Sequence, residues 1–279
     1  MVNLLLAIAS SAMVSIIMRL SDRKVTGNIA MLAVNYLMCL AVSAANAGLG
    51  NLFSVTKGLS TAILMGSING VLYLSGFVLL QINVRRNGVV LSSTFMKLGL
   101  LVSIAVSVLF FHEVPELPQT VGFLLAVAAI ILINFRKENG GTAGFRAGLI
   151  LLLLNGGMAD AMAKIFDELG NPASSHQFLT FTFGIALVLC VALMLYKKQR
   201  PGKWEVLFGL LIGIPNFFST KFLLGALESI PAVIVYPVYS VATILVVSLA
   251  GVMAFRERLE KRQWLGMGLI LVALVLLNI

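Results

Sequence analysis

The chain has 279 residues, of which 59% are hydrophobic and 11% charged. A soluble globular domain carries about 25% charged residues, so this composition excludes a protein whose surface is solvated by water. The formal net charge of +9 would suit a nucleic-acid partner, but the basic residues are spread over loops between apolar segments, which argues against one.

Ten apolar segments follow one another along the chain, each near the ~20 residues that a helix needs to cross a bilayer. We predict membrane-spanning helices at 2–20, 29–49, 58–82, 88–111, 117–135, 146–166, 174–195, 205–226, 231–255 and 263–279. The connections are too short to hold a soluble domain. The predicted fold is therefore an all-α integral membrane protein with ten transmembrane helices.

The basic residues are sorted between alternate loops. Of the 20 Lys and Arg residues, 15 fall in loops 1, 3, 5, 7 and 9, numbered in chain order, and only Lys57 falls in the even loops. Acidic residues divide evenly between the two sets. Because Lys and Arg concentrate in cytoplasmic loops, we predict that the odd loops face the cytoplasm and that both termini face outward. The cell (inner) membrane is the expected location, with lipid as a partner.

The two halves of the chain are related by an internal repeat. A shift of 144 residues lays 101–134 over 245–278 with 12 identities in 34 positions, which include Glu113 with Glu257, Gln119 with Gln263 and Gly122 with Gly266. Apolar composition alone does not align Glu, Gln and Gly in register. We therefore predict two five-helix repeats, 1–138 and 139–279. Five spans each would insert them in inverted orientations, an architecture typical of secondary transporters.

The shared pattern Phe-x-Glu-x-x-x-x-x-Gln-x-x-Gly in both halves resembles the drug/metabolite transporter superfamily in its ten-helix EamA-type form. The Ser229-Ile230-Pro231-Ala232 entry to the ninth span and Pro237 inside it are similar to the same family. The resemblance implies alternating access and a central cavity walled by spans 1, 3, 4, 6, 8 and 9. This chain reads Ser93-Thr94-Phe95 where the family commonly has a proline. Many members also place their termini in the cytoplasm, opposite to the charge count here.

Ionisable residues inside the predicted spans are the first candidates for a binding site, since each costs roughly 2.5–3.5 kcal/mol to insert at mid-membrane. Lys97 lies nine residues into the fourth span, about 13 Å along it. Ser93 lies one turn before it. Asp160 lies in the sixth span with Lys164 one turn after it. We interpret Lys97 as an anion or carboxylate ligand or as a titrating group, and Asp160 as an ammonium ligand or proton carrier. The structural alternatives are a snorkelling lysine and an ion pair of Asp160 with Lys164.

Neutral polar residues at helical spacing extend this candidate site. A polar stripe inside a span either bonds to a neighbouring helix or lines a wet cavity. The substrate-binding candidates of this kind are Asn69, Tyr73, Asn155, Asn216, Tyr236 and Tyr239, and Lys221 with Glu228 is a candidate outer gate or a structural ion pair at the rim.

Glycine pairs predict close packing in both halves. Gly66-x-x-x-Gly70 and Gly209-x-x-x-Gly213 occupy near-equivalent places and predict corresponding helix contacts. Pro215 and Pro237 each remove a hydrogen bond inside a span beside the polar stripe.

The sequence predicts a secondary active transporter of a small polar metabolite, with a zwitterion such as an amino acid favoured by one lysine and one aspartate. Exporters of drugs or of anionic or phosphorylated metabolites, and a non-transporting membrane scaffold, remain open alternatives. A coupling proton is also left open. The two histidines, His112 and His176, lack metal-ligand spacing, so no enzyme, metal or cofactor is expected.

Overall fold

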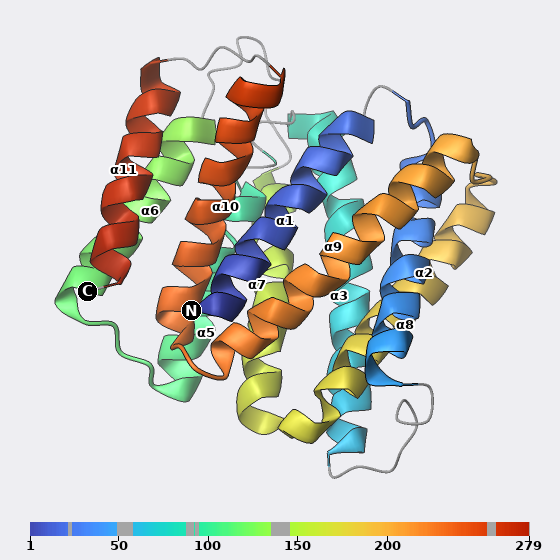
Figure 1. Ribbon diagram of the computed structural model, residues 1–279, viewed down its shortest axis with the longest axis horizontal. Coiled ribbons are helices and arrows are strands. Elements are labelled where there is room, and N and C mark those ends of the chain that lie inside the picture. The colour runs from blue at the N-terminus through green and yellow to red at the C-terminus, as the bar shows by residue number, and fades with distance from the viewer. Residues whose placement is uncertain are drawn as a thin grey trace. The chain divides into compact units, whose positions relative to one another are not determined.

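The structure, a computed structural model, describes residues 1–21, 24–48, 58–87, 92, 95–134, 146–255 and 261–278. Within these residues the chain is all helical, without strands. The helices are α1 (Val2–Ser21), α2 (Asn28–Ala47), α3 (Leu59–Asn87), α5 (Leu100–Phe111), α6 (Leu117–Asn134), α7 (Arg146–Leu169), η1 (Pro172–Ser174), α8 (Ser175–Tyr196), α9 (Lys203–Leu227), α10 (Ala232–Phe255) and α11 (Lys261–Leu277) (Figure 1).

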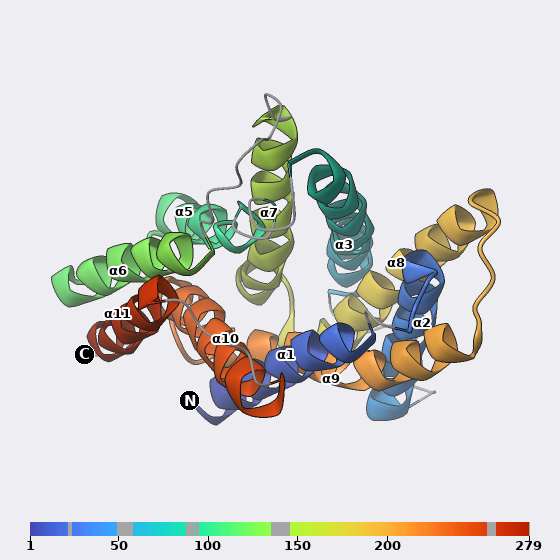
Figure 2. The same ribbon diagram turned by 90° about the horizontal axis from the view of Figure 1, so that it is seen from above.

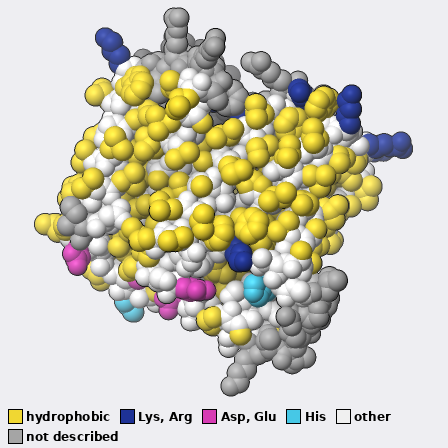
Figure 3. All heavy atoms as spheres, viewed as in Figure 1, with side chains coloured by type: hydrophobic (Ala, Val, Ile, Leu, Met, Phe, Trp, Pro, Cys, Tyr) yellow, Lys and Arg dark blue, Asp and Glu magenta, His cyan; other side chains and the backbone are white. Residues whose placement is uncertain are grey.

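Seven of the described helices are long and apolar enough to cross a bilayer, namely α1, α2, α3, α7, α8, α9 and α10. Shorter apolar helices cover Phe95–Phe111 and Leu117–Ile133. Large apolar side chains are exposed on many of these helices, for example Leu5 at 66% and Val188 at 63%. Hydrophobic side chains cover most of the face seen in Figure 3. A surface of this kind requires lipid rather than water, so the helices belong to a multi-pass membrane protein.

The described residues form two compact units, and each unit takes helices from both sequence halves. Unit 1 comprises Met1–Leu74 and Ile165–Glu228, and unit 2 comprises Ser75–Lys164 and Ser229–Ile279. The predicted repeats, 1–138 and 139–279, are divisions of the sequence and do not coincide with these spatial units. The repeats and the central cavity stay predictions.

In unit 1 the two predicted glycine pairs make corresponding helix contacts. A Cβ atom at Gly66 or Gly70 of α3 would lie 2.6 Å from a carbonyl oxygen of α8. A Cβ atom at Gly209 or Gly213 of α9 would lie 2.7 Å from a carbonyl oxygen of α2. Only glycine permits backbones to approach this closely, so the predicted role of both pairs is confirmed.

Alternate loops gather at the same end of unit 1. The backbone N–H groups of Thr26 and Gly27 in loop 1 donate to Glu205 at the start of α9, which follows loop 7. At the opposite end, Gly58 of loop 2 packs against Asn171 of loop 6. This grouping of odd loops with odd and even with even is what the charge sorting requires.

In unit 2, α6 and α11 run antiparallel and lie side by side in both ribbon views (Figures 1 and 2). A Cβ atom at Gly122 would lie 3.1 Å from the Ala273 carbonyl oxygen, and one at Gly266 would lie 3.4 Å from the Ala129 carbonyl oxygen. The shift of 144 residues aligns Gly122 with Gly266 and Ala129 with Ala273, so each contact is the repeat equivalent of the other.

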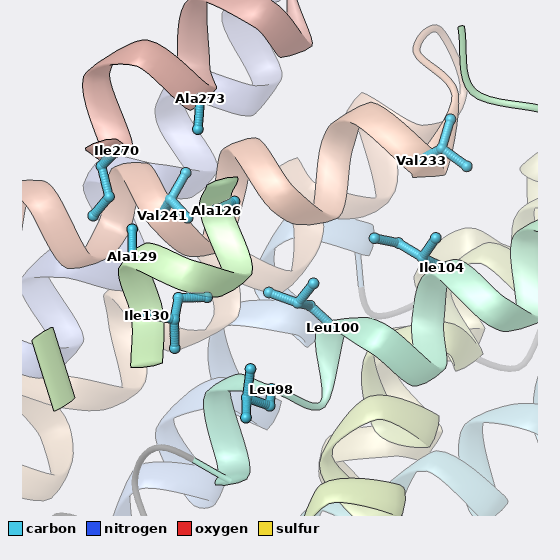
Figure 4. Close-up of a cluster of buried hydrophobic side chains, with 10 residues drawn as sticks. All are labelled: Leu98, Leu100, Ile104, Ala126, Ala129, Ile130, Val233, Val241, Ile270 and Ala273. Atoms are coloured by element: carbon cyan, nitrogen blue, oxygen red, sulfur yellow. The ribbon is translucent and has the colours of Figure 1, made fainter. Parts of the chain in front are cut away.

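The core of unit 2 is a cluster of buried aliphatic side chains from α5, α6, α10 and α11 (Figure 4). Its members are Leu98, Leu100, Ile104, Ala126, Ala129, Ile130, Val233, Val241, Ile270 and Ala273. Close packing of these side chains holds the four helices in fixed positions, and the polar residues of unit 2 are positioned by them.

The described part of the fourth predicted span, 88–111, is not one continuous helix, which corrects the sequence prediction. Helical residues at 95–97 are followed by a turn at Leu98–Gly99, and α5 begins at Leu100. Leu98 in this turn and Leu100 directly after it are both buried (Figure 4). The ends of the other predicted spans agree with the helix ends to within about five residues. Assignment methods alone differ by about one or two residues at each helix end.

Candidate functional site

The interruption of the fourth span is held by a close backbone contact with α7. Gly99 N–H donates to the Met96 carbonyl oxygen at 3.2 Å, a tighter turn than an α-helix makes. A Cβ atom at Gly99 would lie 2.8 Å from the Gly157 backbone nitrogen, and one at Gly157 would collide with the Gly99 carbonyl oxygen. Ser103 Oγ also donates to the Gly157 carbonyl oxygen at 2.9 Å. Non-helical backbone at membrane depth is tolerated where it is buried in protein or lines a cavity.

Lys97 and Asp160 lie next to this interruption. Lys97 is the residue before the turn, and Asp160 lies one turn beyond Gly157 on α7. The two charges are close enough to influence each other but form no direct ion pair, and both side chains are half-buried. The structure therefore brings together the two ionisable residues that the sequence selected. Ser93, the third candidate of this group, lies outside the described residues.

Two tyrosines of α10 belong to the same unit. The Tyr236 hydroxyl donates to the backbone carbonyl oxygen of Asp160 at 2.8 Å, and its side chain is 1% exposed. This bond leaves the Asp160 carboxylate for other partners and fixes α10 against α7. Tyr239 lies three residues further along α10 and is half-buried.

Asn155 lies on α7 near the Lys97–Asp160 pair but bonds to α3. Ser75 Oγ donates to Asn155 Oδ1 at 2.6 Å, and the Asn155 amide lies against Gly76. The side chain is half-buried. The geometry thus gives Asn155 a helix-joining contact in addition to its predicted place near the site.

The ion pair of Lys164 with Asp160 that the spacing suggested is not formed. Its Nζ lies 2.8 Å from Glu113 Oε1, and the Lys164 side chain is only 4% exposed. Glu113 Oε2 also accepts the Val233 backbone N–H at the start of α10, at 3.1 Å. A loop carboxylate therefore neutralises Lys164 and caps a helix at once. Asp160 is left to interact with Lys97.

Sequence reasoning missed the structural role of Glu113, although a signal was present. Glu113 is one of the few charged positions that the repeat aligns with an identical residue, Glu257. That identity marks a position where a carboxylate is required. It does not reveal the partner, because loop 4 and α7 are far apart in sequence.

In unit 1, Tyr73 and Asn216 join one polar network. The Tyr73 hydroxyl lies 3.3 Å from Thr220 Oγ1, and Thr220 donates to the Asn216 carbonyl oxygen at 3.2 Å. The Asn216 amide donates to Asn35 Oδ1 at 3.3 Å. This network follows Pro215, where α9 lacks one backbone N–H donor.

Asn69 lies one turn before Tyr73 on α3 and is only 2% exposed. Its Oδ1 has no hydrogen-bond partner among the described residues. A buried amide oxygen without a donor is costly, so this atom is available to a donor group of a ligand or to a water molecule.

The two gating candidates have different surroundings. Lys221 Nζ donates to Asn46 Oδ1 at 2.7 Å, joining α9 to α2. Glu228 is exposed after the end of α9 and lines a small hollow with Asp167 and Pro172. Their role as a gate stays a prediction.

The comparisons with known proteins agree with this architecture. Residues 146–279 match the model of the EamA-like transporter family. The match covers nearly the whole second half of the chain. The resemblance drawn from the sequence is thereby confirmed, and the family suggests a membrane transporter of the drug/metabolite type.

Two further similarities extend over nearly the whole chain. An uncharacterized protein of Haemophilus influenzae is 25% identical over 274 residues, covering 95% of this chain and 93% of that protein. A protein of known crystal structure has a TM-score of 0.74 at 13% sequence identity, covering 99% of this chain and 94% of that one. The second similarity concerns the fold alone.

The EamA-like chain offers no arrangement typical of metal-dependent chemistry in the part that the structure describes. Within that part, no group of three or more His, Cys, Asp or Glu side chains is placed to hold a metal ion.

Proposed function

We propose that the protein is a secondary transporter of a small zwitterionic metabolite, such as an amino acid, across the inner membrane. The observation that carries this proposal is the Lys97–Asp160 pair beside the interrupted helix. The two charges are close enough to influence each other without forming a direct ion pair, and each side chain keeps part of its surface accessible. The carboxylate of a zwitterionic substrate would replace Asp160 as the partner of Lys97. Its ammonium group would replace Lys97 as the partner of Asp160.

The interrupted backbone places Lys97 directly before a tight turn. The backbone N–H groups at this turn stay bonded within the chain, Gly99 to Met96 and Val102 to Gly99, so side chains rather than backbone groups would hold a substrate here. Gly99 and Gly157 let the broken span lie directly on α7, which keeps Lys97 and Asp160 within reach of one small molecule.

The described cations favour a zwitterion over a phosphorylated metabolite. A phosphate group is best held by more than one cation. Lys164 is neutralised by Glu113, and Lys221 is bonded to the Asn46 amide. Lys97 then remains as a single ammonium group opposite a carboxylate, which suits one positive and one negative group on the substrate.

The transport mechanism in this proposal is alternating access by two inverted repeats, 1–138 and 139–279. The reciprocal contacts of Gly122 and Gly266 between antiparallel α6 and α11 support an inverted relation of the two repeats. Asp160 is the candidate carrier if a proton is coupled to transport.

The test uses three ligands that share one side chain: an amino acid, its decarboxylated amine and its deaminated acid. In proteoliposomes, wild-type protein should prefer the amino acid over both analogues. Lys97→Ala should lose the preference over the amine, and Asp160→Asn the preference over the acid. Each loss should amount to about 10- to 150-fold, since a hydrogen bond to a charged group contributes about 1.5–3 kcal/mol.

Lys197→Ala serves as the matched control, because Lys197 is an exposed lysine of loop 7. It should keep the wild-type preferences. If both site variants also keep them, the Lys97–Asp160 pair is not the substrate site. A protein that transports none of the three ligands in any variant would instead favour a different cargo or a scaffold.

A further inference from the structure

Basic side chains concentrate at the odd-loop end of unit 1, separate from the proposed substrate site. The described members of this group are Arg19, Lys24, Lys197, Lys198, Arg200 and Lys203. Loops 1 and 7 are held together there by Glu205, so these residues share one surface. Figure 3 shows Lys and Arg side chains projecting around the end at which α9 begins.

Trp204 lies within this basic group and is held by an apolar cluster. The core of the cluster is Met31, Phe208 and Ile212, and Trp204 packs against it together with side chains of α1 and loop 1. The Trp204 and Phe208 ring centroids are 6.2 Å apart. The ring is therefore fixed at the junction between the apolar body of unit 1 and its basic end, the depth that tryptophan favours at a membrane surface.

Two ammonium groups lie against this one indole ring. Lys24 Nζ is 4.1 Å and Lys203 Nζ is 5.5 Å from the ring centroid. Each distance is within the range of a cation–π interaction. Two ammonium groups near one ring concentrate positive charge there, and this charge favours binding of an anion.

Glu205, the neighbouring acidic residue, is directed elsewhere. Its Oε1 accepts the backbone N–H of Thr26 at 3.0 Å and that of Gly27 at 3.2 Å, and the residue is 6% exposed. The carboxylate thus satisfies the start of α2 instead of facing the surface. The positive charge of Lys24 and Lys203 remains presented outward.

We propose that Lys24, Lys203 and Trp204 form a binding site for the phosphate group of an anionic phospholipid. Lysine binds phosphate as a compact point charge. Val206, Leu207 and Leu210 are exposed on α9 directly after the site and provide an apolar surface for the acyl chains. This continuity from cations to exposed aliphatic side chains is the reason for assigning a lipid rather than free phosphate.

Fluorescence quenching by brominated lipid tests the site directly, because the chain contains only two tryptophans. Trp264→Phe leaves Trp204 as the single indole. The protein is reconstituted in phosphatidylcholine vesicles that contain an equal fraction of brominated phosphatidylglycerol or brominated phosphatidylcholine. The anionic lipid should quench Trp204 at least several-fold more strongly, and excess inorganic phosphate should not reverse the quenching.

A pair of double variants separates a defined site from general attraction of a basic surface. Lys24→Gln/Lys203→Gln should reduce quenching by the anionic lipid to the phosphatidylcholine level. Lys197→Gln/Lys198→Gln removes the same charge from the same end and should leave quenching unchanged. Equal quenching by the two lipids, equal loss in the two double variants, or reversal by inorganic phosphate would each overturn the proposal. The comparison of the two lipids uses only the Trp264→Phe variant, so it tests the proposal even if the charge variants do not fold.

Discussion

Removing either partner of the Glu113–Lys164 ion pair should strongly lower the free energy of unfolding, because the other charge would stay buried without a partner. Lys164 is 4% exposed and its Nζ lies 2.8 Å from Glu113 Oε1. Removing one partner of a buried pair costs about 3–5 kcal/mol, since the remaining charge is buried without compensation. Glu113 is 15% exposed, so we expect Glu113→Gln and Lys164→Met each to lose about 3 kcal/mol, the low end of that range.

The double variant Glu113→Gln/Lys164→Met should be more stable than either single variant. It buries no uncompensated charge, and the glutamine oxygen still accepts the Val233 N–H. Denaturation of the detergent-purified protein, followed by loss of helical signal, gives the four free energies of a double-mutant cycle. Glu116→Gln in the same exposed loop is the control and should change little. If the single losses simply add in the double variant, the two side chains do not act as a pair.

Three further changes probe other contacts of the fold. Gly157→Ala should destabilise the protein strongly, because its Cβ would also lie 2.5 Å from Val102 Cβ, whereas Gly156→Ala meets its nearest atom at 3.6 Å and should be tolerated in the same thermal assay. Lys97→Met/Asp160→Leu should fold and insert like wild type, as apolar replacements of a charge pair often do, but should abolish uptake in proteoliposomes. Glu205→Gln should cost about 1 kcal/mol in thermal stability through weaker hydrogen bonds to loop 1, and an unchanged midpoint would contradict this role.

The positions of the helices could be predicted from the sequence because the bilayer imposes both length and composition. A span must satisfy its own backbone hydrogen bonds in lipid, so each apolar run of about 20 residues has one plausible structure. The close helix contacts at the glycine pairs could also be predicted from the sequence. Gly66 with Gly70 and Gly209 with Gly213 stand at corresponding places in the two halves, and each pair lies against a neighbouring helix backbone.

The turn after Lys97 could not be predicted, because nothing in the local sequence demands it. Leu98-Gly99 contains no proline, and a single glycine is common inside membrane helices. The interruption depends on Gly157 of α7, whose missing side chain makes room for the Gly99 backbone. Likewise, the i,i+4 spacing of Asp160 and Lys164 suggested a pair, but Glu113 from a distant loop takes Lys164. In both cases a tertiary contact overrides a local pattern.

The contacts of α6 with α11 give the repeat a physical meaning beyond sequence identity. Gly122 meets Ala273 and Gly266 meets Ala129, and the shift that aligns the two halves exchanges these contacts. A self-complementary interface of this kind follows when two equivalent elements pair about a twofold axis. Because α6 and α11 are antiparallel, that axis would relate helices of opposite direction, which is the relation that the predicted inverted repeats would have. At both positions glycine leaves room for the other helix, for Leu276 and the Ala273 carbonyl at Gly122 and for the Ile133 side chain at Gly266.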